Sequence, residues 1–174
     1  MKRAIKNYIA IKNTNSEQHV SIKKQNHMKY LIYIFFFGIF ITQAQTDYNT
    51  KKGFLAEGYD VVSYFENKAE KGNKKYTTTF DGTRFKFTSQ THLDTFKANP
   101  KQYIPQYGGY CAYAVAEKAK KVSVDPETFE IRDGKLYLFY NSWGINTLES
   151  WLKKDVNQLI IKADQSWKFI SEKD

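Results

Sequence analysis

Three side chains in this sequence could carry chemistry: Cys111, His92 and Asp60. Cys111 is the only cysteine, and it follows Gly108 and Gly109, so we expect it in the first turn of the next helix. There the unpaired backbone N–H groups and the helix dipole favour a thiolate over a thiol. A thiolate can be a nucleophile, a redox centre or a ligand for a soft metal. The alternative is an inert cysteine that packs beside the alanines of that helix.

His92 and Asp60 are the other two candidates. His92 is the only histidine beyond residue 44, and we expect it early in a helix, as a metal ligand, a base or an ordinary surface histidine. Asp60 stands just before a predicted strand, where it either caps a turn or offers its carboxylate to a site. One cysteine and one histidine leave a tetrahedral metal site two ligands short. Asp60, water or a second chain would have to complete it.

Two chemistries use these residues together. In a thiol enzyme, Cys111 would be the nucleophile, His92 its base and Asp60 the acid that orients the base. In a binding module, Cys111 and His92 would hold a soft ion such as Cu(I), because thiolate and imidazole both suit that ion. The sequence has no Cys-x-x-Cys, no phosphate-binding glycine loop and no Gly-x-Ser-x-Gly. We therefore expect a non-enzymatic module, with copper or another soft metal as the candidate cofactor.

The front of the chain has the pattern of a secretory signal peptide. Lys29 precedes an apolar run at residues 31–41, and small residues suited to cleavage end at Ala44. Such a run makes about 16 Å of helix, too short for a bilayer core of about 30 Å. We expect residues 28–44 to be cleaved and the protein to be exported, periplasmic or secreted, with no stable membrane span. Residues 1–27 would precede the true start at Met28 or extend the leader, and an uncleaved anchor is the alternative.

The charge of the chain belongs mostly to this leader. The 174 residues carry a net charge of +9, with 27 Lys and Arg against 18 Asp and Glu. Residues 1–44 hold seven of the basic residues and one of the acidic ones, which leaves +3 for the rest. A strongly basic surface is the footprint of a nucleic-acid-binding protein. We therefore expect no nucleic-acid partner.

The elements that must position the candidate residues are two hairpins interleaved with helices. Asp-Gly turns at 81–82 and 133–134 predict hairpins over 76–87 and 128–140. Ser89 is expected to cap a helix that ends before Pro100 and buries Leu93 and Phe96. Apolar residues recur at helical spacing from residue 146 onward, with a break near Asp155. This order has no βαβ rhythm and predicts a small single α+β domain.

The remaining segments complete the expected organisation. Residues 45–53 are polar and read as a flexible start, and residues 54–170 as the domain itself. The run at 61–65 is rich in branched and aromatic residues and predicts a short strand. In the second hairpin the register places one apolar set on a common face: Phe129, Ile131, Leu136, Leu138 and Tyr140.

Three motifs resemble the exported members of the YHS domain family. They are Gly-Tyr-Asp-Val-Val-Ser-Tyr-Phe at 58–65, Asn-Pro-Lys-Gln-Tyr at 99–103 and Tyr-Gly-Gly-Tyr-Cys-Ala at 107–112. The family patterns are Gly-Tyr-Asp-Pro-Val-x-Tyr-Phe, Asn-Pro-x-x-Tyr and Tyr-Gly-Gly-x-Cys-Ala, in the same order. The resemblance covers about residues 54–168. It implies a small α+β domain.

The resemblance also implies a heavy-metal role, with copper suspected, for the members of the family that carry cysteines at set positions. In this sequence Ser63, Thr88 and His92 stand at or near those positions. Of these three residues, His92 is a competent metal ligand, whereas Ser63 and Thr88 are poor ones. Cys111 belongs to the pattern of the exported subgroup. The expected function is an exported, YHS-like binding module with Cys111, His92 and Asp60 as candidate metal ligands. The alternatives are a ligand-free envelope interaction or structural module, and a thiol enzyme.

Overall fold

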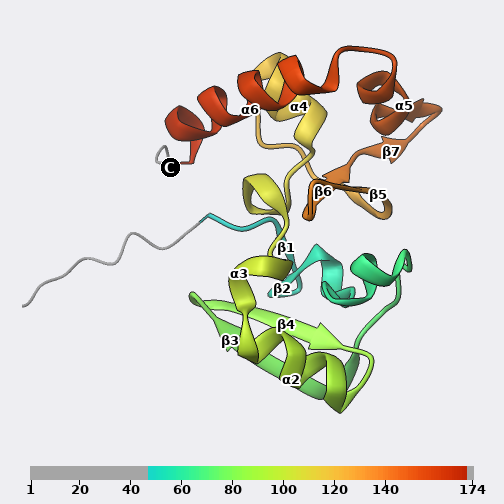
Figure 1. The fold of residues 1–174 in the computed structure, drawn as a ribbon, viewed down its shortest axis with the longest axis vertical. Helices are drawn as coiled ribbons and strands as arrows, with labels where there is room; N and C mark the ends of the chain where they lie inside the picture. Colours follow the sequence, from blue (N-terminus) through green and yellow to red (C-terminus); the bar gives the residue numbers. More distant parts are fainter. Residues whose placement is uncertain (1–46, 172–174) are drawn as a thin grey trace, which may run out of the picture. The chain divides into compact units, whose positions relative to one another are not determined.

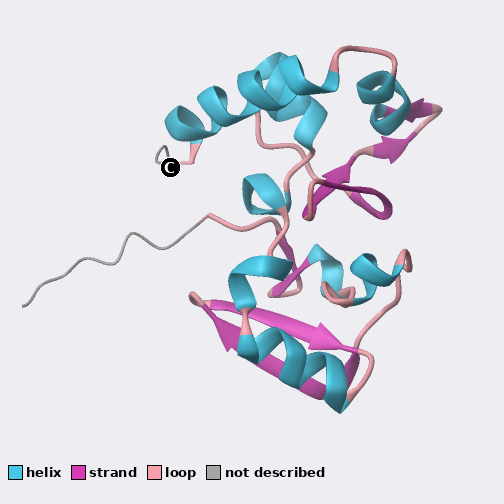
Figure 2. Ribbon diagram, viewed as in Figure 1, coloured by secondary structure: helices cyan, strands magenta, loops and turns pink. Residues whose placement is uncertain are grey.

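The computed structural model describes residues 47–171, which lie in the compact unit Gln45–Asp174. The predicted start, signal peptide and cleavage site lie outside the described residues. Helices and small sheets alternate along the described part, as Figure 2 shows, and this confirms the predicted α+β class. Within residues 47–171, no helix is both long and apolar enough to cross a bilayer.

The first sheet has four strands in the order β1-β2-β4-β3. Its strands are β1 (Thr50–Lys51), β2 (Phe54–Leu55), β3 (Asn73–Phe80) and β4 (Thr83–Phe87). The β3–β4 hairpin has the predicted register, with Phe80 opposite Thr83. Asp81 and Gly82 both have positive φ, as a two-residue turn of this kind requires. Helix α2 (Gln90–Ala98) packs against this hairpin (Figure 1).

The predicted strand at 61–65 is wrong. The segment between β2 and β3 holds two short 3-10 helices, η1 (Ala56–Gly58) and η2 (Ser63–Glu66). The physical reason is Asp60, whose Oδ1 accepts a hydrogen bond from the backbone N–H of Val62 at 2.9 Å and closes a turn. Val61 and Val62 are buried by this turn without belonging to a sheet.

The described part of the segment that was expected to be a flexible start, residues 47–53, takes part in the first sheet. Strand β1 pairs with β2, and the backbone N–H of Asn49 donates to the carbonyl of Gly108 at 2.8 Å. The side-chain amide of Asn49 donates to the carbonyl of Gly109 at 3.0 Å. Polar composition suggested a free segment, whereas these side-chain and backbone groups find partners about sixty residues away.

The middle of the chain leads into the second hairpin. Its elements are α3 (Pro100–Tyr103), η3 (Gln106–Gly109), α4 (Ala112–Lys118), β5 (Asp125–Arg132) and β6 (Lys135–Phe139). The pairs Phe129–Leu138 and Ile131–Leu136 confirm the predicted register. The opposite face of β6 is buried as well, because Tyr137 and Phe139 pack against Trp151. The alternation of side chains along the hairpin had predicted that only one face of β6 is buried.

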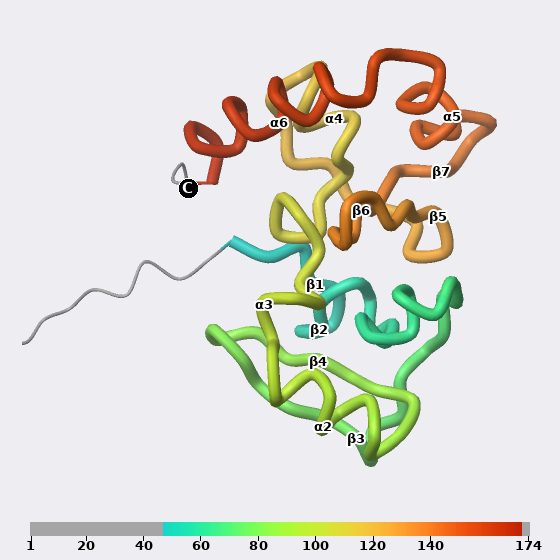
Figure 3. The backbone as a smooth tube through the Cα atoms, in the orientation of Figure 1, coloured from blue at the N-terminus to red at the C-terminus, as the bar shows by residue number. Residues whose placement is uncertain are grey.

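The C-terminal part contains a third hairpin that was not predicted. It consists of β7 (Asn141–Ser142) and β8 (Ile145–Asn146), followed by α5 (Thr147–Leu152) and α6 (Val156–Ile170). Figure 3 shows the tight turn that follows β7 at the right-hand edge of the view. Asp155 caps α6 by accepting from the N–H groups of Asn157 and Gln158, which confirms the predicted break.

Two hydrophobic clusters form the core of the described residues. The first joins β4 and α2 to Cys111 and to Leu136 and Leu138 of β6. The second lies among η3, β6 and the helices α4, α5 and α6, with Trp151 fully buried. Strand β6 therefore separates the two clusters and contributes side chains to both.

Candidate functional site

Asp60 is the centre of a buried hydrogen-bond network. Its carboxylate is fully buried. Oδ2 accepts hydrogen bonds from the N–H of Thr88 at 2.8 Å, the hydroxyl of Thr88 at 2.9 Å and Nδ1 of His92 at 2.7 Å. Together with the bond from Val62 to Oδ1, these contacts tie η2 to the end of β4 and the start of α2. Asp60 thus does cap a turn, and it also forms a pair with His92.

His92 lies between two carboxylates. Its Nδ1 contacts Asp60, and its Nε2 lies 3.2 Å from Oε1 of Glu66. A neutral imidazole has one N–H and can donate to only one of these two carboxylates at a time. The position of the ring follows from the start of α2, where the N–H of His92 donates to the Ser89 hydroxyl at 3.1 Å.

Cys111 lies in a different environment. It is the N-cap residue of α4, and its side chain accepts no hydrogen bond from the helix. Its sulfur is 3.3 Å from the hydroxyl of Thr147, and that hydroxyl donates to the carbonyl of Tyr140 at 2.8 Å. Either the thiol or the hydroxyl can donate in the contact between Cys111 and Thr147. Cys111 is fully buried and packs in the first core cluster.

The structure therefore joins two of the three candidate residues. Asp60 and His92 form one network, whereas Cys111 has Thr147 as its side-chain partner. Within residues 47–171, no group of three or more His, Cys, Asp and Glu side chains is arranged to hold a metal ion. Both ring nitrogens of His92 face carboxylate oxygens at hydrogen-bond distance. Among the described residues, Cys111 and His92 share no hydrogen bond, and each has other side-chain partners.

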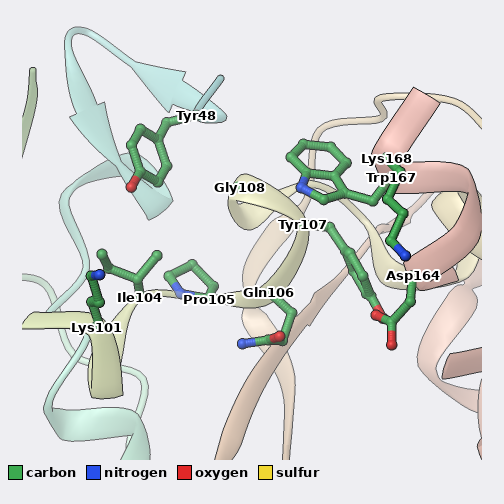
Figure 4. Close-up of a pocket in the computed structure, with 10 residues that line it drawn as sticks. All are labelled: Tyr48, Lys101, Ile104, Pro105, Gln106, Tyr107, Gly108, Asp164, Trp167 and Lys168. Atoms are coloured by element: carbon green, nitrogen blue, oxygen red, sulfur yellow. The ribbon is translucent and has the colours of Figure 1, made fainter. Parts of the chain in front are cut away.

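A pocket of about 510 Å³ lies elsewhere in the unit, within the size range of small-molecule sites. Figure 4 shows Tyr48 and Trp167 on either side of Pro105 and Gly108. Its polar lining comes from four side chains: Lys101, Gln106, Asp164 and Lys168. The pocket thus combines aromatic walls with a few polar groups, as ligand sites commonly do.

The aromatic wall is held by its own contacts. The ring of Trp167 lies 6.1 Å from those of Tyr107 and Tyr110, centroid to centroid. The hydroxyl of Tyr107 donates to Oδ1 of Asp164 at 3.0 Å. Burial, and next the charge of Asp164, raise the pKa of Tyr107 above its ordinary range, so the phenol stays protonated as a donor. One oxygen of Asp164 is therefore already occupied.

The backbone beneath the pocket has an uncommon conformation. Tyr107 has φ of 56° and Gly108 has φ of 60°, both in the left-handed region. A Cβ at Gly108 would lie 2.1 Å from the carbonyl oxygen of Asp47. Only glycine fits there, and this close approach brings the segment that carries Tyr48 to the edge of the pocket.

Sequence reasoning missed this pocket. Tyr48 lies in the segment expected to be flexible, and Trp167 belongs to an apolar stripe that indicated only helix packing. The turn motif around Gly108 was the available signal, because it positions Tyr107 and draws the start of the chain alongside. Glu66 was also missed, since its contact with His92 depends on the turn that replaces the predicted strand.

The chain was compared with protein-family models, curated proteins and solved structures, and none of them matches it.

Proposed function

We propose that this chain is an exported, non-enzymatic binding module of the YHS type. We further propose that its pocket at Tyr107 and Trp167 takes a small organic anion with a planar, apolar body. The pocket itself carries this proposal. The partly exposed rings of Trp167 and Tyr48 offer faces for a planar ligand, and Ile104 adds apolar surface.

The charges around the pocket favour an anion. Lys101 and Lys168 line it, against the single carboxylate of Asp164, which already accepts a hydrogen bond from Tyr107. A ligand carboxylate would meet a net positive rim. Its planar body would replace water over the indole of Trp167.

The test compares matched ligands. Indole acetate and salicylate are titrated calorimetrically into the chain beside their neutral amides, which have nearly the same shape. We expect the acids to bind more tightly than the amides, and a Lys101→Gln, Lys168→Gln double variant to remove that preference. Equal binding of acid and amide by the native chain would contradict the anion assignment.

A second pair of variants tests the aromatic wall. Trp167→Ala should weaken binding of acids and amides alike, because it removes the stacking face. Phe169→Ala is the matched control, since Phe169 is exposed on the same helix and does not line the pocket. If both variants bind as the native chain does, the pocket is not the site. If neither acid nor amide binds to the native chain, the ligand-free interaction module becomes the better proposal.

The soft-metal hypothesis is tested separately. Cu(I) is titrated into the native chain and into Cys111→Ser and His92→Ala variants. Because Cys111 is fully buried beside Thr147 and His92 contacts two carboxylates, we expect no binding that depends on either residue. Tight Cu(I) binding by the native chain that is lost in the Cys111→Ser variant would support the soft-metal hypothesis.

A further inference from the structure

The turn of the β7–β8 hairpin displays a tryptophan to solvent. Trp143 is 93% exposed, and Ile145, two residues later, is 57% exposed. Trp143 and Gly144 form the two-residue turn, with φ of 53° and 75°. A tryptophan with positive φ is strained, and its side chain gains no burial there in return.

The other two hairpins of the described residues show what this turn needs. They use Asp81-Gly82 and Asp133-Gly134, with positive φ at both positions of each turn. Asp and Asn are the residues that tolerate this conformation, and Asp-Gly is a preferred pair. Trp143 stands where the other turns place an aspartate. The requirements of the turn therefore do not explain it.

The surroundings of the hairpin are basic. Ile145 lines a pocket of about 280 Å³ together with Lys118 and Tyr113, and the ammonium of Lys154 lies 5.3 Å from the centroid of Tyr113. The two segments that supply most of this lining, 113–121 and 140–154, carry five lysines and two glutamates. Lys154 pairs with Glu117, Lys153 with Glu149 and Lys121 with Asp47. Lys118 and Lys120 form no ion pair with any described residue and carry the free positive charge.

We propose that the Trp143–Ile145 turn inserts into the interface of a bilayer that contains anionic lipids. Tryptophan and an aliphatic side chain beside it suit the boundary between headgroups and acyl chains. Lysines nearby add attraction to negatively charged headgroups. A convex turn can enter a lipid interface directly, whereas a protein partner would need a groove shaped to receive it.

The experiment uses the full chain and reads Trp143 itself. All three tryptophans lie between residues 143 and 167, so the apolar run at 31–41 adds no tryptophan signal even where it binds lipid. The chain is mixed with vesicles of equal parts phosphatidylcholine and phosphatidylglycerol with brominated acyl chains. The emission of Trp143 is obtained by subtracting the emission spectrum of the Trp143→Phe variant from that of the native chain. We expect this emission to be quenched, and to be quenched less on phosphatidylcholine alone or in high salt.

Two outcomes would overturn the proposal. One is emission from Trp143 that brominated lipid leaves unquenched. The other is a dependence on phosphatidylglycerol that a Lys118→Gln, Lys120→Gln variant leaves unchanged, because the basic residues among 1–44 would then account for it instead of the lysines beside the hairpin. Trp143→Asp gives a folded variant for vesicle binding, since it copies the other two turns and should unfold at the same temperature or higher. If native chains associate while Trp143→Asp chains stay monomeric, and lipid does not quench, the partner is a second copy.

Discussion

The carboxylate of Asp60 accepts hydrogen bonds from its own turn and from a segment about thirty residues further along the chain. Val62, Thr88 and His92 all donate to it, and the residue has no exposed surface. A buried carboxylate is costly unless such donors surround it. The positions where the resemblance suggested metal ligands, Thr88 and His92, are those that satisfy Asp60. The sequence showed the three residue types, but their mutual contacts depend on how the turn at residue 60 folds.

The first prediction concerns this network. Asp60→Asn keeps the shape of the side chain but replaces one carboxylate oxygen with an NH2 group. That group is a hydrogen-bond donor, and it would face the groups that donate to the carboxylate in the native chain. We expect the free energy of unfolding to fall by about 1–3 kcal/mol, measured by urea denaturation. Glu66→Gln is the control: Glu66 is exposed, and its replacement should change stability by less than about 0.5 kcal/mol. Equal effects of the two variants would place the network at the surface.

The second prediction concerns Cys111, for which the sequence left a reactive and an inert reading open. Cys111 is fully buried and its sulfur contacts the Thr147 hydroxyl, so a thiol reagent must wait for local opening. We expect native Cys111 to react with a disulfide reagent far more slowly than the same residue in urea. Thr147→Val, which removes the hydroxyl beside the sulfur, serves as a comparison. Native and urea-unfolded protein reacting at similar rates would revive the thiolate reading.

Local sequence signals predicted those elements that depend on few residues. Asp-Gly turns placed two hairpins with the right register, and Ser89 and Asp155 marked helix starts. The signal failed where tertiary contacts decide. Val61 and Val62 have high strand propensity, but the Asp60 turn buries them outside a sheet. The β7–β8 hairpin escaped detection because Trp143 replaces the aspartate that marks the other turns.

The third prediction tests the second hairpin. Leu138 is fully buried in β6 and pairs with Phe129, so Leu138→Ala leaves a cavity beside the first core cluster. We expect a loss of about 2–5 kcal/mol in the free energy of unfolding. Leu152→Ala is the matched control, because Leu152 is 54% exposed and should cost less than about 0.5 kcal/mol. A loss at position 138 no larger than that at 152 would overturn the register.

At the scale of the whole unit, the fold class could be predicted, whereas the pocket could not. The pocket combines Tyr48, Tyr107 and Trp167, which are separated by up to 119 positions in the sequence. Helical periodicity assigned Trp167 to a packing stripe, and composition assigned Tyr48 to a free segment. Neither signal predicts the hydrogen bond from the backbone N–H of Asn49 to the carbonyl of Gly108, which holds the segment of Tyr48 beside the turn that carries Tyr107.

The fourth prediction follows from the buried tyrosines. Burial, and next the hydrogen bond to Glu127, raise the pKa of Tyr59 to about 12, and burial also raises the pKa of Tyr137 to about 12. The unfolded chain ionises near the ordinary value of about 10. An acid held protonated by the fold contributes stability that is complete below pH 10 and is lost as the pH rises toward 12.

The urea midpoint should therefore stay level up to about pH 9 and fall steeply above about pH 10. Tyrosinate absorbance, measured in parallel, should rise later in native protein than in urea. Tyr59→Phe should make the alkaline fall shallower, because one of the groups that resist ionisation is gone. Native and unfolded protein that ionise together would show that these phenols are exposed.

The last prediction concerns the division of the chain at Ala44. The compact unit begins at Gln45, and the members of both core clusters that are described come from residues beyond 47. If the leader is a signal peptide, the protein recovered from the host envelope should begin near Gln45 by mass spectrometry. A chain that starts at Gln45 should unfold at the same temperature and urea concentration as the full chain, because it keeps every core residue that the structure describes. Intact protein that begins at Met1 or Met28 would count against cleavage. A large loss of stability on deletion would instead show that residues 1–44 take part in the folded core.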